Sequence, residues 1–273
     1  MSPRLAGVSR IDALFSSLAA ARRKALVPFI TAGDPSREAT VGIMHALVRG
    51  GADLIELGVP FSDPMADGPV IQRSSERALA RGIGTADVFD YVREFRSQDS
   101  TTPVVLMGYL NPVEMRGAAT YAAQAAAAGV DGVLLVDLPA EEADPFRETF
   151  NGHGVELIAL VAPTTSPARL RKVAQAAQGY LYYVSYAGVT GATLGDAGDI
   201  GARTGALRAM TGVPVLIGFG IKDAQSAAAM AVLADGIVVG SALVERLSGA
   251  TDAQQSARWA QEFMAPLRAA IDA

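Results

Sequence analysis

Residues 53–59 read DLIELGV, and all but two of these residues are apolar. A segment that is apolar at nearly every position, rather than at every second one, is typical of a strand buried on both faces in a parallel sheet. Seven other segments have the same character, and helical periodicity fills the intervals between them. The eight expected strands are residues 25–32, 53–59, 103–109, 132–138, 156–162, 180–185, 214–220 and 236–242.

Eight strands that alternate with helices predict an α/β fold of the (β/α)8 TIM-barrel type, because eight parallel strands close into a barrel. The alternative is an open doubly wound sheet, which usually has fewer strands and a G-x-G-x-x-G turn after the first one. Residues 29–36 read FITAGDPS instead. We expect one domain over residues 1–273, with an extra N-terminal helix that Ser9 caps and an extra helix at 85–98, before strand 3.

Composition limits the possible functions. Half of the 273 residues are hydrophobic, but no run reaches the roughly 18 uncharged residues of a membrane span. The net charge of −5 argues against binding to nucleic acid or to an anionic membrane. The sequence has no cysteine, which excludes disulfides and thiolate chemistry, and it has no histidine cluster for a transition metal. The N-terminus lacks the apolar segment of a signal peptide, so we expect a cytoplasmic protein.

In an eight-stranded barrel the active site lies at the carboxyl ends of the strands. None of the three lysines, Lys24, Lys172 and Lys222, falls where a buried Schiff-base amine is expected. The two histidines fit structural positions, His45 packed on a helix and His153 at the surface. The groups left for chemistry near the strand ends are carboxylates and tyrosines. We therefore expect general acid–base catalysis.

Glu56 stands out because it lies inside an apolar strand, where burial raises the pKa of a carboxyl group. Alternation along the strand places it on the same face as Leu54. Asp63 and Asp67 lie in the following loop, in SDP and ADGP contexts that favour turns, so turn chemistry alone explains either one. Asp137 ends strand 4 and fits a structural or a functional role equally well.

Glycine-rich turns follow three successive strands late in the chain: GVTG at 188–191, GFG at 218–220 and VGSA at 239–242. Glycines let backbone N–H groups approach phosphate oxygens, and Ser241 adds a hydroxyl donor. Barrels commonly bind phosphate with the loops after strands 7 and 8. The substrate expected from these features is a small phosphate ester.

Five motifs together carry a family resemblance: ALVPFITAGDP, ELGVPFSDPMADGPVIQ, YYVSYAGVTG, GFGI and VGSALV. They resemble the α subunit of tryptophan synthase over the whole chain, including the helix before strand 1. The resemblance implies reversible retro-aldol cleavage of indole-3-glycerol phosphate to indole and glyceraldehyde 3-phosphate, in tryptophan biosynthesis. The sequence departs from the family pattern at Gly108 and Tyr186.

The resemblance also implies roles for individual residues. Glu56 matches the catalytic glutamate, which protonates indole C3 and takes the proton of the glycerol hydroxyl. Asp67 matches the catalytic aspartate, which accepts a hydrogen bond from the indole N–H. Asp63 matches a loop residue that shapes the subunit interface. The positions implied around the substrate are Phe29, Leu134, Tyr182, Thr190 and Phe219, and those around the phosphate are Gly191, Gly220, Gly240 and Ser241.

The family implies a partner as well, a β subunit that carries pyridoxal phosphate (PLP) and receives the indole within an α2β2 heterotetramer. No cofactor is implied in this chain. The loops at 60–69 and 188–198 would close over the site. Three alternatives remain: a stand-alone lyase that releases free indole, a phosphosugar isomerase or class I aldolase on the same barrel, and a barrel that only regulates a partner.

Overall fold

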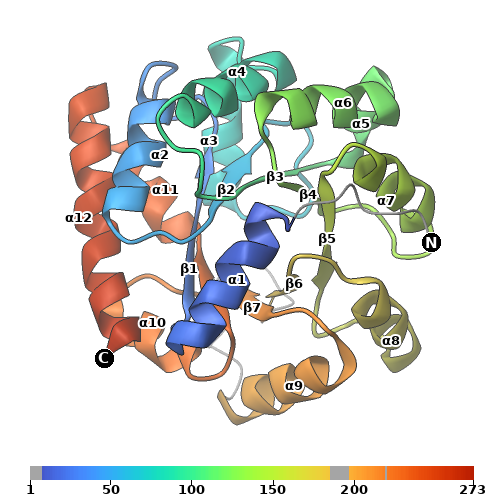
Figure 1. Cartoon of the computed structure of the whole chain (residues 1–273). Helices are drawn as coiled ribbons and strands as arrows, with labels where there is room; N and C mark the ends of the chain where they lie inside the picture. The colour runs from blue at the N-terminus through green and yellow to red at the C-terminus, as the bar shows by residue number, and fades with distance from the viewer. Residues whose placement is uncertain (1–7, 185–196, 219) are drawn as a thin grey trace.

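The computed structural model describes residues 8–184, 197–218 and 220–273, and its eight parallel strands form a closed barrel (Figure 1). Each strand pairs with the next, and β8 pairs with β1 to close the ring. The predicted fold is confirmed. The strands are β1 (Ala25–Thr31), β2 (Ile55–Gly58), β3 (Val104–Gly108), β4 (Gly132–Leu135), β5 (Glu156–Val161), β6 (Leu181–Val184), β7 (Val215–Gly218) and β8 (Gly236–Val239).

Helices surround the barrel as an outer layer (Figure 1). Both predicted additions are present, α1 before β1 and α4 before β3. None of the described helices is long and apolar enough to cross a membrane. The helices are α1 (Arg10–Ala21), α2 (Ala39–Arg49), α3 (Pro69–Ala80), α4 (Thr85–Arg96), α5 (Leu110–Arg116), α6 (Ala118–Ala128), α7 (Ala143–Gly152), α8 (Pro167–Ala176), α9 (Ala197–Met210), α10 (Ala224–Ala231), α11 (Ser241–Ser248) and α12 (Ala253–Asp272).

Two hydrophobic layers follow from the alternation of side chains along the strands. The larger layer lies between the strands and the outer helices. The smaller layer fills the barrel interior and includes Leu54, just before β2. Alternation along the strand places Glu56 of β2 on the same face as Leu54. The register sets Phe29 of β1 beside Glu56, and Glu56 beside Val105 of β3. The strand pairing therefore fixes the position of the carboxylate within the barrel.

Helix α1 covers one end of the barrel (Figure 1). Ser9 caps it as predicted, its hydroxyl accepting the Asp12 N–H at 3.0 Å. The buried face of α1, with Ile11, Phe15 and Leu18, joins the interior layer. The ring of Phe15 lies 6.0 Å from that of Tyr180. The α1 helix thus keeps water out of the barrel from below, opposite the carboxyl ends of the strands.

Candidate active site

Glu56 is fully buried at the interior face of β2. The hydroxyl of Tyr180 donates a hydrogen bond to its Oε1 at 2.6 Å, whereas Oε2 has no hydrogen-bond partner among the described residues. Burial raises the pKa of Glu56 to about 7, and the bond from Tyr180 opposes that rise. A carboxyl group with this pKa can both give and take a proton near neutral pH.

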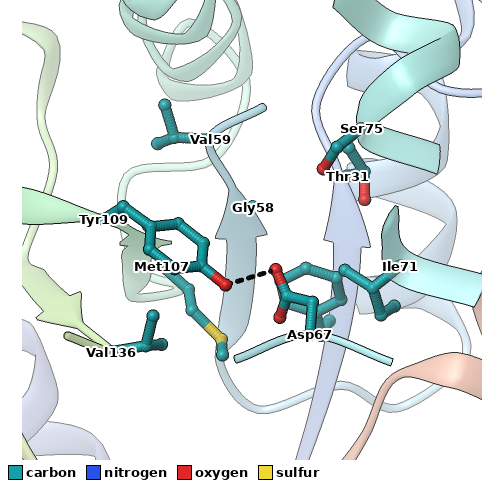
Figure 2. A pocket seen from close by; sticks show the side chains of 11 residues that line it. Thr31, Gly58, Val59, Asp67, Ile71, Ser75, Met107, Tyr109 and Val136 are labelled. Atoms are coloured by element: carbon teal, nitrogen blue, oxygen red, sulfur yellow. Dashed lines mark hydrogen bonds between the residues drawn. The ribbon is translucent and has the colours of Figure 1, made fainter. Parts of the chain in front are cut away.

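Asp67 lies in the loop between β2 and α3, where its backbone N–H donates to the Pro64 carbonyl at 3.0 Å. The turn predicted at this position is therefore present. Its side chain points inward, and Oδ2 accepts a hydrogen bond from the Tyr109 hydroxyl at 3.0 Å (Figure 2). Burial raises the pKa of Asp67 to about 6, against the lowering effect of Tyr109. Asp67 is thus mostly ionised at neutral pH.

A pocket opens beside Asp67 at the carboxyl ends of the first strands (Figure 2). Gly58 leaves room for the ring of Phe29, because a Cβ at this position would overlap that ring. The walls are largely apolar. They are formed by Phe29, Thr31, Gly58, Val59, Asp67, Ile71, Ser75, Met107, Gly108, Tyr109 and Val136.

Tyr182 and Leu134 belong to the same interior layer as the strand segment that carries Glu56. Gly218 of β7 makes the position of Tyr182 possible, because a Cβ on this glycine would overlap the Tyr182 hydroxyl. The charges of Glu56 and Asp67 add to burial in raising the pKa of Tyr182 well above its ordinary value. Tyr182 therefore lies within electrostatic reach of both carboxylates.

The predicted phosphate residues Gly240 and Ser241 lie at the N-terminus of α11, Gly240 as its N-cap residue and Ser241 as its first residue. A Cβ on Gly240 would make ordinary contact with Phe29, so this end of α11 borders the pocket wall. Gly220 has a φ of 72°, a left-handed conformation that favours glycine. Three predicted site residues, Thr190, Gly191 and Phe219, lie outside the described residues.

The structure separates the remaining acidic candidates. Asp63 is exposed, and its side chain accepts only the neighbouring Ser62 hydroxyl at 2.5 Å among the described residues. Asp137, just after β4, accepts the Leu110 N–H at 2.8 Å and so stabilises the first turn of α5. This contact supports the structural role, one of the two that the sequence leaves open for Asp137.

The lysines and histidines lie where the sequence predicts. Lys24 donates to the Ala234 carbonyl at 2.6 Å, just before β1, while Lys172 is on α8 and Lys222 is exposed. His45 packs on Phe95 with ring centroids 4.7 Å apart, and His153 is exposed. Over the described ranges no group of three or more His, Cys, Asp or Glu residues could hold a metal.

Comparison with known proteins decides the family. The family model of the tryptophan synthase alpha chain matches residues 15–272. The chain belongs to the tryptophan synthase alpha chain family. Alpha chains from Xylella fastidiosa strain 9a5c and Xanthomonas campestris pv. campestris strain 8004 are 64% and 63% identical to it. Each match covers 97% of this chain, and the matches cover 98% of the Xylella chain and 97% of the Xanthomonas chain.

Solved structures agree with this assignment. The tryptophan synthase alpha subunit from Legionella pneumophila str. Paris superposes with a TM-score of 0.90 at 46% identity, covering 97% of this chain and 99% of that one. A tryptophan synthase chain from Mycobacterium tuberculosis superposes with a TM-score of 0.87 at 35% identity, covering 97% and 99%. As a tryptophan synthase alpha chain, this protein is a lyase that cleaves indole-3-glycerol phosphate in tryptophan biosynthesis.

Two contacts of the carboxylates in this alpha chain were not predicted. Tyr180 contacts Glu56 across 124 positions of sequence, and Tyr109 contacts Asp67 across 42. Each tyrosine lies at or next to the end of an expected strand, which is the only sequence signal that either one carries. Strand order in the barrel, rather than any local motif, brings these pairs together.

Proposed function

We propose that Glu56 and Asp67 are the catalytic pair for cleavage of indole-3-glycerol phosphate. The observation that carries this proposal is the fully buried carboxyl of Glu56, whose pKa is raised to about 7 inside the barrel. The reaction needs a proton donor and a proton acceptor, and a single group can serve as both. A carboxyl poised near neutral pH serves both steps.

In the proposed reaction, protonated Glu56 delivers its proton to indole C3, and a positive charge develops on the ring nitrogen. The bond between C3 and the glycerol chain then breaks, and its electron pair returns to the ring and restores the aromatic indole. The hydroxyl on the departing carbon loses its proton to Glu56, and that carbon becomes the aldehyde of glyceraldehyde 3-phosphate. Glu56 ends the cycle protonated, as it began.

Asp67 is proposed to act electrostatically. Its carboxylate would accept a hydrogen bond from the indole N–H and stabilise the positive charge that develops on the ring. The pKa of about 6 leaves Asp67 mostly ionised at neutral pH, as this role requires. With Asp67 ionised and Glu56 protonated in the active form, the pH profile of kcat/KM should fall on the acidic side near 6 and on the alkaline side near 7.

The pocket offers complementary surfaces for the two ends of this substrate. Apolar walls that include Phe29, Ile71 and Met107 would enclose the indole ring. The phosphate would lie at the N-terminus of α11, where Gly240, Ser241 and the backbone N–H groups of the first helical turn favour an anion. Gly220, Thr190, Gly191 and Phe219 are proposed to complete this end, and Leu134 and Tyr182 to line the interior near Glu56.

We also propose that the chain binds a tryptophan synthase β subunit in an α2β2 heterotetramer in the cytoplasm. The PLP would belong to that partner, which would receive the indole. Two exposed methionines support a partner surface near the mouth of the barrel. Met65, in the loop after β2, is 83% exposed, as is Met115 on α5 after β3. Co-elution with the β subunit on size exclusion and faster cleavage in its presence would test this.

The test of the catalytic pair is an assay of indole-3-glycerol phosphate cleavage, coupled to oxidation of the glyceraldehyde 3-phosphate by a dehydrogenase. Glu56→Gln should lower kcat by about 10²- to 10⁴-fold, the usual contribution of general acid–base catalysis. Asp67→Asn should be severely impaired but keep some activity. Near-normal turnover of folded Glu56→Gln would refute its assignment.

A further inference from the structure

Tyr109, at the end of β3, connects two elements of the site through its hydroxyl group. The hydroxyl donates to Asp67 Oδ2 at 3.0 Å (Figure 2). It also accepts the backbone N–H of Ala66 at 3.0 Å. The phenol ring stacks on Phe61 from the same loop, with centroids 5.0 Å apart and planes 27° from parallel. Three contacts from one side chain thus hold the loop between β2 and α3.

We propose that Tyr109 is a positioning residue, whose hydroxyl holds one carboxylate oxygen of Asp67 so that the other remains for the substrate N–H. This inference rests on the proposed role of Asp67. Oδ1 of Asp67 accepts no hydrogen bond from the described residues, while Oδ2 is occupied by Tyr109. A hydroxyl has a single proton to donate, so its bond to Oδ2 leaves Oδ1 available for an external donor.

Tyr109 is itself firmly placed. Its side chain is 5% exposed, and its backbone is the N-cap of α5. The carboxylate of Asp137, at the end of β4, accepts the N–H of the next residue, Leu110, at 2.8 Å. The anchor is therefore part of the barrel rim, whereas the group that it holds, Asp67, belongs to a loop. A fixed donor on a strand end suits the positioning of a carboxylate that the loop alone would not orient.

The hydroxyl also bears on the charge of Asp67. Tyr109, just after β3, and Tyr182 from β6 interact with Asp67, while Glu56 from β2 acts on Tyr182 and Asp137, just after β4, acts on Tyr109. None of these groups is a cation. Burial raises the pKa of Asp67, and the Tyr109 bond is the contribution from the described residues that lowers it. Loss of this bond should therefore favour the protonated carboxyl group.

The test is Tyr109→Phe in full-length protein, which keeps the stacked ring and removes the hydroxyl, and with it both the bond to Asp67 and the bond from the Ala66 N–H. We expect kcat/KM to fall about 10- to 100-fold, as for loss of a hydrogen bond to a charged group. The acidic limb of the pH profile should move to higher pH, because Asp67 would bind its proton more tightly. Tyr121→Phe is the matched control, since Tyr121 packs edge-on against Phe89 and Phe150 on the outer helices and should leave activity unchanged.

Asp67→Asn separates the two proposals. In that background Tyr109→Phe should have little further effect, because the hydroxyl acts through the carboxylate. If Asp67→Asn alone retains near wild-type activity, the proposed role of Asp67 fails, and the inference fails with it. If Asp67→Asn is severely impaired but Tyr109→Phe matches the wild type, only the inference is wrong. A fall in activity without movement of the acidic limb would also contradict it, because misplacement of the loop alone would have that effect.

Discussion

Replacing Glu56 by glutamine should stabilise the fold at alkaline pH while it abolishes cleavage. Burial raises the pKa of Glu56 from an ordinary 4.5 to about 7, so the ionised form is unfavourable inside the barrel. Glutamine has nearly the same shape and stays neutral at every pH. Its amide oxygen can still accept the hydrogen bond that Tyr180 donates to Oε1.

The magnitude and sign follow from the two pKa values. Between pH 4.5 and about 7 the folded protein retains a proton on Glu56 that the unfolded chain has released. The free energy of unfolding therefore falls as the pH rises through this window. At about 1.4 kcal/mol per pKa unit, the interval corresponds to about 3 kcal/mol. The glutamine variant avoids this loss, so it should gain up to about 3 kcal/mol at pH 8 and nothing below pH 4.5.

Urea unfolding followed by the fluorescence of Trp259, the single tryptophan, measures this effect at pH 5 and pH 8. The midpoint of Glu56→Gln should exceed that of the wild type at pH 8 and approach it at pH 5. Glu148→Gln is a control of the same chemistry at an exposed position on α7 and should show no such dependence. A variant less stable than the wild type at pH 8, or a difference that is the same at both pH values, would refute the reasoning.

Three further predictions concern the support of the site. Phe15→Ala should lower the free energy of unfolding by about 3–5 kcal/mol in urea titrations, because it leaves a cavity under the barrel. Gly218→Ala should reduce cleavage but preserve the far-ultraviolet circular dichroism spectrum, because the added Cβ displaces Tyr182 from the interior. Asp137→Ala should cost about 0.5–2 kcal/mol in unfolding experiments, since it removes the acceptor for the Leu110 N–H.

The fold could be predicted because burial on both faces leaves a continuous apolar signature in every strand. All eight strands lie inside the expected segments, and all eight are shorter than expected. The segment 53–59 shows why, since its strand covers only Ile55–Gly58. Asp53 instead accepts the Leu26 N–H and a bond from Arg268, both at 2.8 Å. Such contacts end a strand through distant partners, which local hydrophobicity does not reveal.

The site was only partly predictable. A charge inside an apolar run is a local signal, and it correctly indicated the buried Glu56. Turn chemistry could not distinguish Asp63 from Asp67, because both occupy similar proline-containing turns. The structure distinguishes them by direction, since Asp63 is exposed and Asp67 turns inward to Tyr109. That difference depends on a residue 42 positions away, so no property of the loop sequence alone contains it.

The two carboxylates are held in different ways, so different mutations should affect the titration of each one. Glu56 stands on a strand paired on both sides, and its pKa depends on a dry interior closed from below by α1. Asp67 stands on a loop, and its orientation depends on the hydroxyl group of Tyr109, just after β3. Changes under the barrel, such as Phe15→Ala, should admit water toward Glu56 and move the alkaline limb of the pH profile. Changes at Tyr109 should move the acidic limb instead. One variant that moved both limbs together would mean that the carboxylates titrate as a coupled pair rather than as two separately supported groups.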